Sequence, residues 1–106
     1  MELPIVNWQS PSGVEFEWNS AKALINLRKH KVPFLMACEV FKDGDKLERA
    51  DASSEYGEER WIVLGRVEQT ILFVVYTQRG QRIRLISARR ANRDEQRRYW
   101  TGDLSA

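Results

Sequence analysis

The sequence predicts an α+β fold in which an antiparallel sheet of about four strands carries two N-terminal helices and a C-terminal helix. Three apolar runs, rich in β-branched and aromatic residues, predict the centre of the sheet: Trp61–Val67, Ile71–Thr77 and Ile83–Ala88. Short polar breaks separate these runs, and breaks this short force neighbouring strands to run antiparallel. The middle run is apolar on both faces, so we expect other elements to cover each side of it.

The predicted domain begins with a strand and a helix. Val14–Trp18 alternates apolar and acidic residues, which is the period of a half-buried strand. Asn19 is a suitable N-cap, and a helix is predicted from Ser20 to about His30. Three apolar residues recur at helical spacing on it and are expected to face the sheet: Ala21, Leu24 and Leu27.

The same helix carries a polar stripe on its opposite side. The stripe consists of Lys22, Asn26, Lys29 and His30, the only histidine in the chain. Two interpretations stay open at this point. The stripe is either the solvated back of the helix, with His30 complementing the helix dipole, or part of a functional site.

A second, short helix is expected after the break at Val32-Pro33, because proline is tolerated at a helix start. It should end near Phe41. Its apolar residues are predicted to be core residues, and Cys38 is most simply a small buried apolar group.

The last elements are an edge strand and a helix. Leu47–Ala50 is compatible with a short edge strand, and residues 51–58 form a polar loop. Asn92 and Glu95 have the spacing of a capping box and predict a last helix over roughly Arg93–Trp100. Near its end, Tyr99 and Trp100 either dock the helix on the sheet or are exposed to a partner.

The chain is expected to hold one domain, over residues 14–101. A length of 106 residues suffices for a single two-layer core. Residues 1–13 are predicted to be an N-terminal extension, either partly disordered or added to a sheet edge, and residues 102–106 a C-terminal tail.

Composition excludes several classes of protein. One cysteine excludes an internal disulfide framework, and one cysteine with one histidine is too few for the usual zinc site, so we predict no metal and no cofactor. No apolar run reaches the roughly 18 residues that cross a bilayer, and the N-terminus does not resemble a signal peptide. We therefore expect a cytoplasmic protein without a membrane partner.

Charge is distributed unevenly along the chain. Residues 39–60 carry eight acids and four bases, a balance of −4, whereas residues 79–98 carry eight arginines and two acids, a balance of +6. Such a basic segment is either a solvated face or a site for phosphate or an acidic partner. Its bases are all arginine, which favours bidentate phosphate contacts.

The chemistry that this inventory suits is RNA cleavage without a metal. The chain has no glycine-rich phosphate loop and no nucleophile elbow. In metal-independent cleavage the ribose 2′-OH attacks the adjacent phosphate, a base and an acid move the protons, and fixed cations stabilise the phosphoryl oxygens. Arginines suit the last role, and His, Glu or Lys side chains suit the first two.

Taken together, the residues resemble the BrnT family of bacterial toxins, whose fold is similar to that of RelE. The matching positions run in the family's order over residues 16–99. They are Phe16-Glu17-Trp18, Lys22, Asn26, Lys29-His30, Phe34, Ala37, Val40-Phe41, Gly57-Glu58-Glu59-Arg60-Trp61, Gly65, Thr77, Arg79-Gly80, Ile83-Arg84, Ile86-Ser87-Ala88-Arg89, Ala91, Glu95 and Tyr99.

The resemblance implies a metal-independent ribonuclease toxin of a type II toxin–antitoxin system, which inhibits translation by cutting RNA. It also implies a partner similar to BrnA, an antitoxin with a ribbon-helix-helix DNA-binding part. Such an antitoxin would cover the toxin, and operator DNA would be contacted only through it.

Three positions depart from the family's pattern. Asn19 stands where the family usually has Asp, and Lys31 replaces the Gly that commonly follows Lys-His. Lys42-Asp43-Gly44 replaces an Asp-Pro. We therefore expect the first helix to end differently at Lys31.

The resemblance and the chemistry together suggest roles for individual residues. The candidates for catalysis are Lys22, Lys29 and His30, with Glu59 as an alternative base, and Arg60, Arg79, Arg84 and Arg89 as phosphate ligands. The candidates for RNA binding are Arg66, Arg82, Arg90, Trp61 and Tyr76. Two other functions remain open, a module that binds nucleic acid without cutting it and a decayed toxin that only binds an antitoxin.

Overall fold

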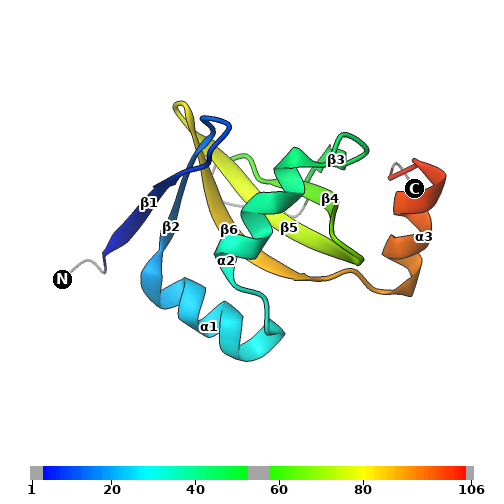
Figure 1. The fold of residues 1–106 in the computed structure, drawn as a ribbon, viewed down its shortest axis with the longest axis horizontal. Helices are drawn as coiled ribbons and strands as arrows, with labels where there is room; N and C mark the ends of the chain where they lie inside the picture. Colours follow the sequence, from blue (N-terminus) through cyan, green and yellow to red (C-terminus); the bar gives the residue numbers. More distant parts are fainter. Residues whose placement is uncertain (1–3, 53–57, 105–106) are drawn as a thin grey trace.

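The computed structural model describes residues 4–52 and 58–104, which form an α+β fold around one mixed sheet (Figure 1). The sheet has six strands in the order β1-β2-β6-β5-β4-β3. The elements in chain order are β1 (Ile5–Gln9), β2 (Glu15–Asn19), α1 (Ser20–His30), α2 (Phe34–Cys38), the 3₁₀ helix η1 (Glu39–Lys42), β3 (Leu47–Ala50), β4 (Trp61–Val67), β5 (Thr70–Arg79), β6 (Arg82–Arg90) and α3 (Arg93–Thr101).

The predicted meander is confirmed, but the prediction of an antiparallel sheet of about four strands is wrong. Strands β4, β5 and β6 pair antiparallel in sequence, as their short connections require. Strand β2, however, pairs in parallel with β6, with Glu15 opposite Arg82 and Glu17 opposite Arg84. Partners that lie more than sixty residues apart leave no local signal of their register, so this pairing could not be predicted from spacing.

Two edge strands complete the sheet. Strand β1 pairs antiparallel with β2, so part of the predicted N-terminal extension is an added edge strand. Strand β3 pairs antiparallel with β4 at the other edge, as its sequence allowed. Most of the loop predicted over residues 51–58 lies outside the described residues.

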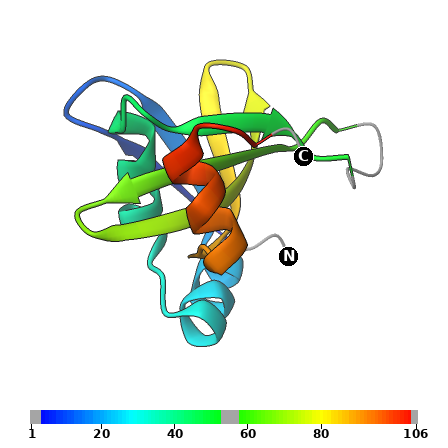
Figure 2. The same ribbon diagram turned by 90° about the vertical axis from the view of Figure 1, so that its right-hand side faces the viewer.

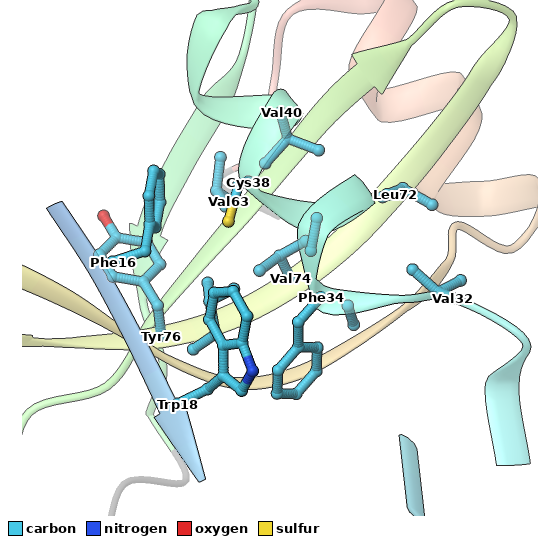
Figure 3. Close-up of a cluster of buried hydrophobic side chains, with 13 residues drawn as sticks. Phe16, Trp18, Val32, Phe34, Cys38, Val40, Val63, Leu72, Val74 and Tyr76 are labelled. Atoms are coloured by element: carbon cyan, nitrogen blue, oxygen red, sulfur yellow. The ribbon is translucent and has the colours of Figure 1, made fainter. Parts of the chain in front are cut away.

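The main core lies between the sheet and α2. Alternate residues of β5, Leu72, Val74 and Tyr76, point to this face and are at most 7% exposed. Phe16 and Trp18 of β2 join them, and α2 contributes Phe34 and Cys38 (Figure 3). Burial raises the pKa of the Cys38 thiol to about 12, so Cys38 is a small buried apolar group, as predicted.

A smaller core lies on the other face, beneath α3 (Figure 2). Leu64, Ile71 and Tyr99 are buried there, and the Tyr99 hydroxyl donates to Asp43 Oδ2 at 2.5 Å. The middle of the sheet is therefore covered on both faces, as the apolar sequence of β5 predicts. Tyr99 docks the helix, whereas Trp100 is 64% exposed.

The first helix has the predicted bounds but the opposite orientation. Asn26 of the polar stripe is buried, at 6% exposure, and contacts β6. Leu24 and Leu27, which were predicted to face the sheet, are 47% and 39% exposed, and Ala21 is half-buried. The expectation for this helix was thus wrong, because spacing shows that a helix has two unlike sides but not which of them a neighbouring strand takes.

Asn26 fixes this orientation by pairing with the backbone of β6. Its Nδ2 donates to Ala88 O at 2.8 Å and to Val32 O at 3.1 Å, and the Ala88 N–H donates to its Oδ1 at 3.1 Å. Strand β2 pairs with β6 only over Arg82–Arg84, so this edge of β6 lacks a neighbouring strand at Ala88. The side-chain amide replaces that strand with the same donor and acceptor pair.

The helix ends at Lys31 despite the missing glycine. Lys31 has φ 62° and ψ 25°, the left-handed conformation that glycine usually supplies at this position, and its N–H donates to Leu27 O. The expectation of a different ending was wrong, because the backbone keeps this geometry and the lysine accepts the strain.

We predict that Asn26→Ala lowers the free energy of unfolding by about 2 kcal/mol, because it leaves the buried Ala88 N–H and the Ala88 and Val32 carbonyl oxygens without the hydrogen bonds of the amide. Asn26→Asp should be at least as damaging, since a carboxylate cannot donate to either carbonyl oxygen. Urea unfolding measures both, with Asn7→Ala, at an exposed position of β1, as the matched control. Wild-type stability of Asn26→Ala would refute the role of the amide.

We predict that Lys31→Gly stabilises the fold by up to about 1 kcal/mol, because it removes the strain of a left-handed Cβ. Lys31→Ala removes the same charge but keeps the Cβ, so it should not stabilise. Thermal unfolding of the two variants separates strain from charge, and equal melting temperatures would contradict the prediction.

Candidate active site

The side of the sheet opposite α2 carries most of the predicted arginines. On β6, Arg82 and Arg84 alternate with the core residue Leu85, and Arg79 of β5 pairs with Arg82. One end of this face is covered by α3, and the start of α1 lies toward the other end (Figures 1 and 2). Several of the cations gather at the end beside α1.

The first hollow lies at this end and has a volume of about 80 Å³. Its cations come from three separate parts of the chain: Lys22 of α1, Arg60 just before β4, and Arg79 and Arg84 of the hairpin β5–β6. Side chains that are distant in the sequence therefore meet at one point. Four cations in one hollow make it a candidate site for an anion.

Carboxylates hold two of these cations in place. Arg84 Nη1 lies 2.8 Å from Glu17 Oε2, and the two side chains are only 18% and 12% exposed. Arg79 Nε lies 2.9 Å from Glu58 Oε1 in a more exposed pair. The Thr77 hydroxyl donates to Glu59 O at 2.6 Å, which ties the segment before β4 to β5. The hollow is thus braced from β2, β5 and β6.

Lys22 is the cation that remains available. It is exposed in the first turn of α1, and its ammonium makes no hydrogen bond or ion pair with any described residue. The first turn of α1 has no acidic residue, and its N-cap Asn19 also lines the hollow. The positive end of the helix dipole therefore adds to the attraction for an anion.

A second hollow, of about 230 Å³, adjoins the first. The two share Lys22 and Ile86 in their walls. The second hollow is further lined by Ile25, Lys29, His30 and Ser87. It joins apolar surface to cationic and hydroxyl groups, which suits a nucleoside better than a bare phosphate. Asn26 also lines it, but the amide is already bonded to Ala88 and Val32 and acts as a wall.

Several predicted catalytic residues lie outside the first hollow. Lys29 and His30 line the second one. Glu59 follows Glu58 in the chain, but its side chain is exposed and lines neither hollow. Arg89 lies beside α3, where it forms two hydrogen bonds with Glu95, at 2.8 and 2.9 Å, and sits 4.0 Å from the centre of the Phe73 ring.

The predicted RNA-binding residues are dispersed over the molecule. Tyr76 is 7% exposed in the main core, and Trp61 packs against the same core, so both lie on the face opposite the arginines. Arg82 lies 3.7 Å from Glu15, and Arg66 lies over the Trp100 ring beside α3. Arg90 is exposed at the end of β6.

Three residues that line or brace the hollows had no predicted role there. Glu17 was expected only to alternate with core residues, and its pairing with Arg84 depends on the parallel register of β2 and β6. Thr77 looked like the end of a strand. Asn26 was noticed as part of a polar stripe, but its partner at Ala88 lies 62 residues away in the chain.

A metal site and a membrane-spanning helix are both absent from the described residues. Within residues 4–52 and 58–104, no group of three or more His, Cys, Asp or Glu side chains is placed to hold a metal ion. In the same ranges no helix is long and apolar enough to cross a membrane.

The fold and the hollows describe a small α+β protein with two adjoining hollows lined by cations. Comparison with protein families specifies it further. The family model for the ribonuclease toxin BrnT of type II toxin–antitoxin systems matches residues 18–95, most of the chain, so this chain belongs to that family. The match begins at Trp18 of β2 and includes every cation of both hollows. No curated protein matches the chain significantly.

The contact between Arg89 and Glu95 predicts a defined dependence on pH. Burial raises the pKa of Glu95, but the hydrogen bonds from Arg89 and the Asn92 N–H outweigh burial and hold the pKa below its usual value. The stabilisation is therefore complete above the unfolded pKa of about 4.3 and is lost as the pH falls through the folded pKa. Glu95→Gln should cost about 1 kcal/mol at pH 7 and progressively less toward pH 3.

Urea unfolding of wild type and Glu95→Gln across this pH range measures the effect. Glutamine still serves in a capping box, so the difference reports the charge. Glu39→Gln, in an exposed pair with Lys42, is the control and should cost less than about 0.5 kcal/mol. A Glu95→Gln deficit that persists unchanged at pH 3 would contradict the assignment.

Proposed function

We propose that this chain cleaves single-stranded RNA, with the reacting phosphate in the first hollow. The observation that carries the proposal is the convergence of Lys22 with Arg60, Arg79 and Arg84 in that hollow. The family to which the chain belongs is one of ribonuclease toxins, which supports RNA as the anion.

The proposed reaction needs no metal ion. The ribose 2′-oxygen attacks the adjacent phosphorus, a 2′,3′-cyclic phosphate forms, and the 5′-oxygen leaves with a proton. Negative charge grows on the phosphoryl oxygens, where Lys22 and the arginines supply fixed positive charge. Charge stabilisation by preorganised groups is usually the largest contribution to such a rate enhancement.

Proton transfer is assigned by position. Among the described residues, Glu58 is the only carboxylate that lines the first hollow, so we assign Glu58, rather than the alternative base Glu59, to accept the 2′-OH proton. We assign Lys22 to protonate the 5′-oxygen as the P–O bond to it breaks. Lys29 and His30 are assigned to the second hollow, where they contact the nucleotide next to the reacting phosphate.

The finer properties of the family extend the proposal. We infer a RelE-like toxin that acts in the cytoplasm and inhibits translation. We also infer neutralisation by an antitoxin similar to BrnA, whose ribbon-helix-helix part binds the operator DNA. The support is membership of a family of type II toxins.

The test is cleavage of a 5′-labelled single-stranded RNA by the purified chain in EDTA. Wild type should produce fragments that end in a cyclic phosphate. Lys22→Ala should lower the rate about a hundredfold, because one fixed donor of an oxyanion site is worth 10²–10³ in rate. It should leave stability unchanged, since no described residue depends on the ammonium.

Two variants serve as controls. Arg28→Ala removes an exposed cation from the same helix outside both hollows, and it should cut at the wild-type rate. Arg89→Ala should lower the melting temperature, because Arg89 braces α3. At temperatures where this variant is folded, it should still cut RNA. Retardation of RNA without fragments would replace the proposal with a binding module, and equal rates for Lys22→Ala and Arg28→Ala would remove the first hollow as the active site.

A further inference from the structure

Helix α1 exposes its apolar side. Leu24, Ile25 and Leu27 are 47%, 61% and 39% exposed, although the helix packs on the sheet. The inward side is taken by Asn26, whose amide must reach Ala88. An amphipathic helix normally buries its apolar side, so three aliphatic side chains on the outer surface of one short helix mark an interaction surface.

The charge around these aliphatic residues is of one sign. The segment Ser20–Cys38 contains four Lys or Arg residues and no Asp or Glu. Arg28, Lys29 and Lys31 are exposed beside the aliphatic residues. A partner that fits this surface presents aliphatic side chains flanked by carboxylates.

This surface also borders the hollows. Ile25 and Lys29 line the second hollow, and Lys22, one turn before Ile25 and two turns before Lys29, lines both. A segment that lies along α1 and covers Ile25 therefore reaches the rim of the second hollow. A partner segment that binds the aliphatic side chains would thereby also exclude RNA.

We propose that the outward face of α1, made of Leu24, Ile25, Leu27 and Arg28, is the docking surface for an acidic amphipathic helix of the antitoxin, and that docking there closes both hollows. The inference of inhibition rests on the toxin function proposed above. Membership of a toxin–antitoxin family supplies the protein partner, and the charge selects its chemistry. A second copy of this chain would bring the same positive charge and repel.

The test measures the affinity of the chain for the antitoxin encoded beside it, using the purified proteins. The double variant Leu24→Lys with Leu27→Lys should bind at least about thirtyfold more weakly, because it places two charges in the apolar contact. The matched control is Ile5→Lys with Val14→Lys, at residues 40% and 37% exposed on β1 and before β2. The control should bind as wild type does.

A second measurement does not depend on substitution. Hydrogen exchange of α1 amides in the wild-type complex should slow relative to the free chain, while exchange in β1 stays unchanged. RNA cleavage by the free double variant should stay at the wild-type rate, because neither leucine lines a hollow. This activity readout separates failure of the docking surface from failure of the proposed ribonuclease.

Several outcomes would overturn the docking proposal. They are wild-type affinity of the Leu24/Leu27 variant, equal weakening of the Ile5/Val14 control, and unprotected α1 amides in the complex. Binding of the free chain to anionic vesicles or to itself through these leucines, without antitoxin protection of α1, would assign the surface to a different partner. Weakened antitoxin binding in a chain that cuts no RNA would leave the docking surface standing and remove the ribonuclease.

Discussion

The pairing of the Asn26 amide with the backbone of Ala88 is the contact on which the rest of the molecule depends. An unpaired N–H and C=O on a buried strand edge are costly, and β2 ends before it can satisfy them. Asn26 does so from a helix, and this fixes the rotation of α1 about its own axis. That rotation sets Lys22 and Lys29 beside β6 and turns the leucines outward, so one hydrogen-bonded pair decides both the hollow and the exposed surface.

The first hollow brings together cations that repel one another. A carboxylate partner reduces this repulsion for some of these cations more than for others. Arg84 is neutralised by a nearly buried Glu17, and such pairs stabilise only when both partners are present. The Arg84 guanidinium is therefore held in one position in the wall of the hollow. Lys22 has no such partner among the described residues, so its charge is the part of the site that a phosphate can bind without first breaking an ion pair.

Sequence-based prediction succeeded where the interacting residues lie close together in the chain and failed where they lie far apart. The capping box of α3, with Asn92 and Glu95 bonded reciprocally, was predicted because its two residues lie three apart. The hairpins of β4, β5 and β6 were predicted for the same reason. The parallel register of β2 on β6 and the inward side of α1 depend on partners more than sixty residues away, so neither could be predicted from spacing. The Glu17–Arg84 pair was missed with them.

The division of the predicted catalytic residues between two hollows has a geometric cause. Lys22 and Lys29 lie seven residues apart on α1, a rise of about 10 Å along the axis. Two lysines at that spacing contact neighbouring nucleotides more easily than one phosphate. Lys22 and Ile86 line both hollows, so under the proposed function the hollows hold neighbouring nucleotides of one strand. A base can enter the second hollow only when it is unstacked, and bases inside a duplex are stacked and paired. Under the proposed function, the two hollows therefore select unpaired RNA before any base is read.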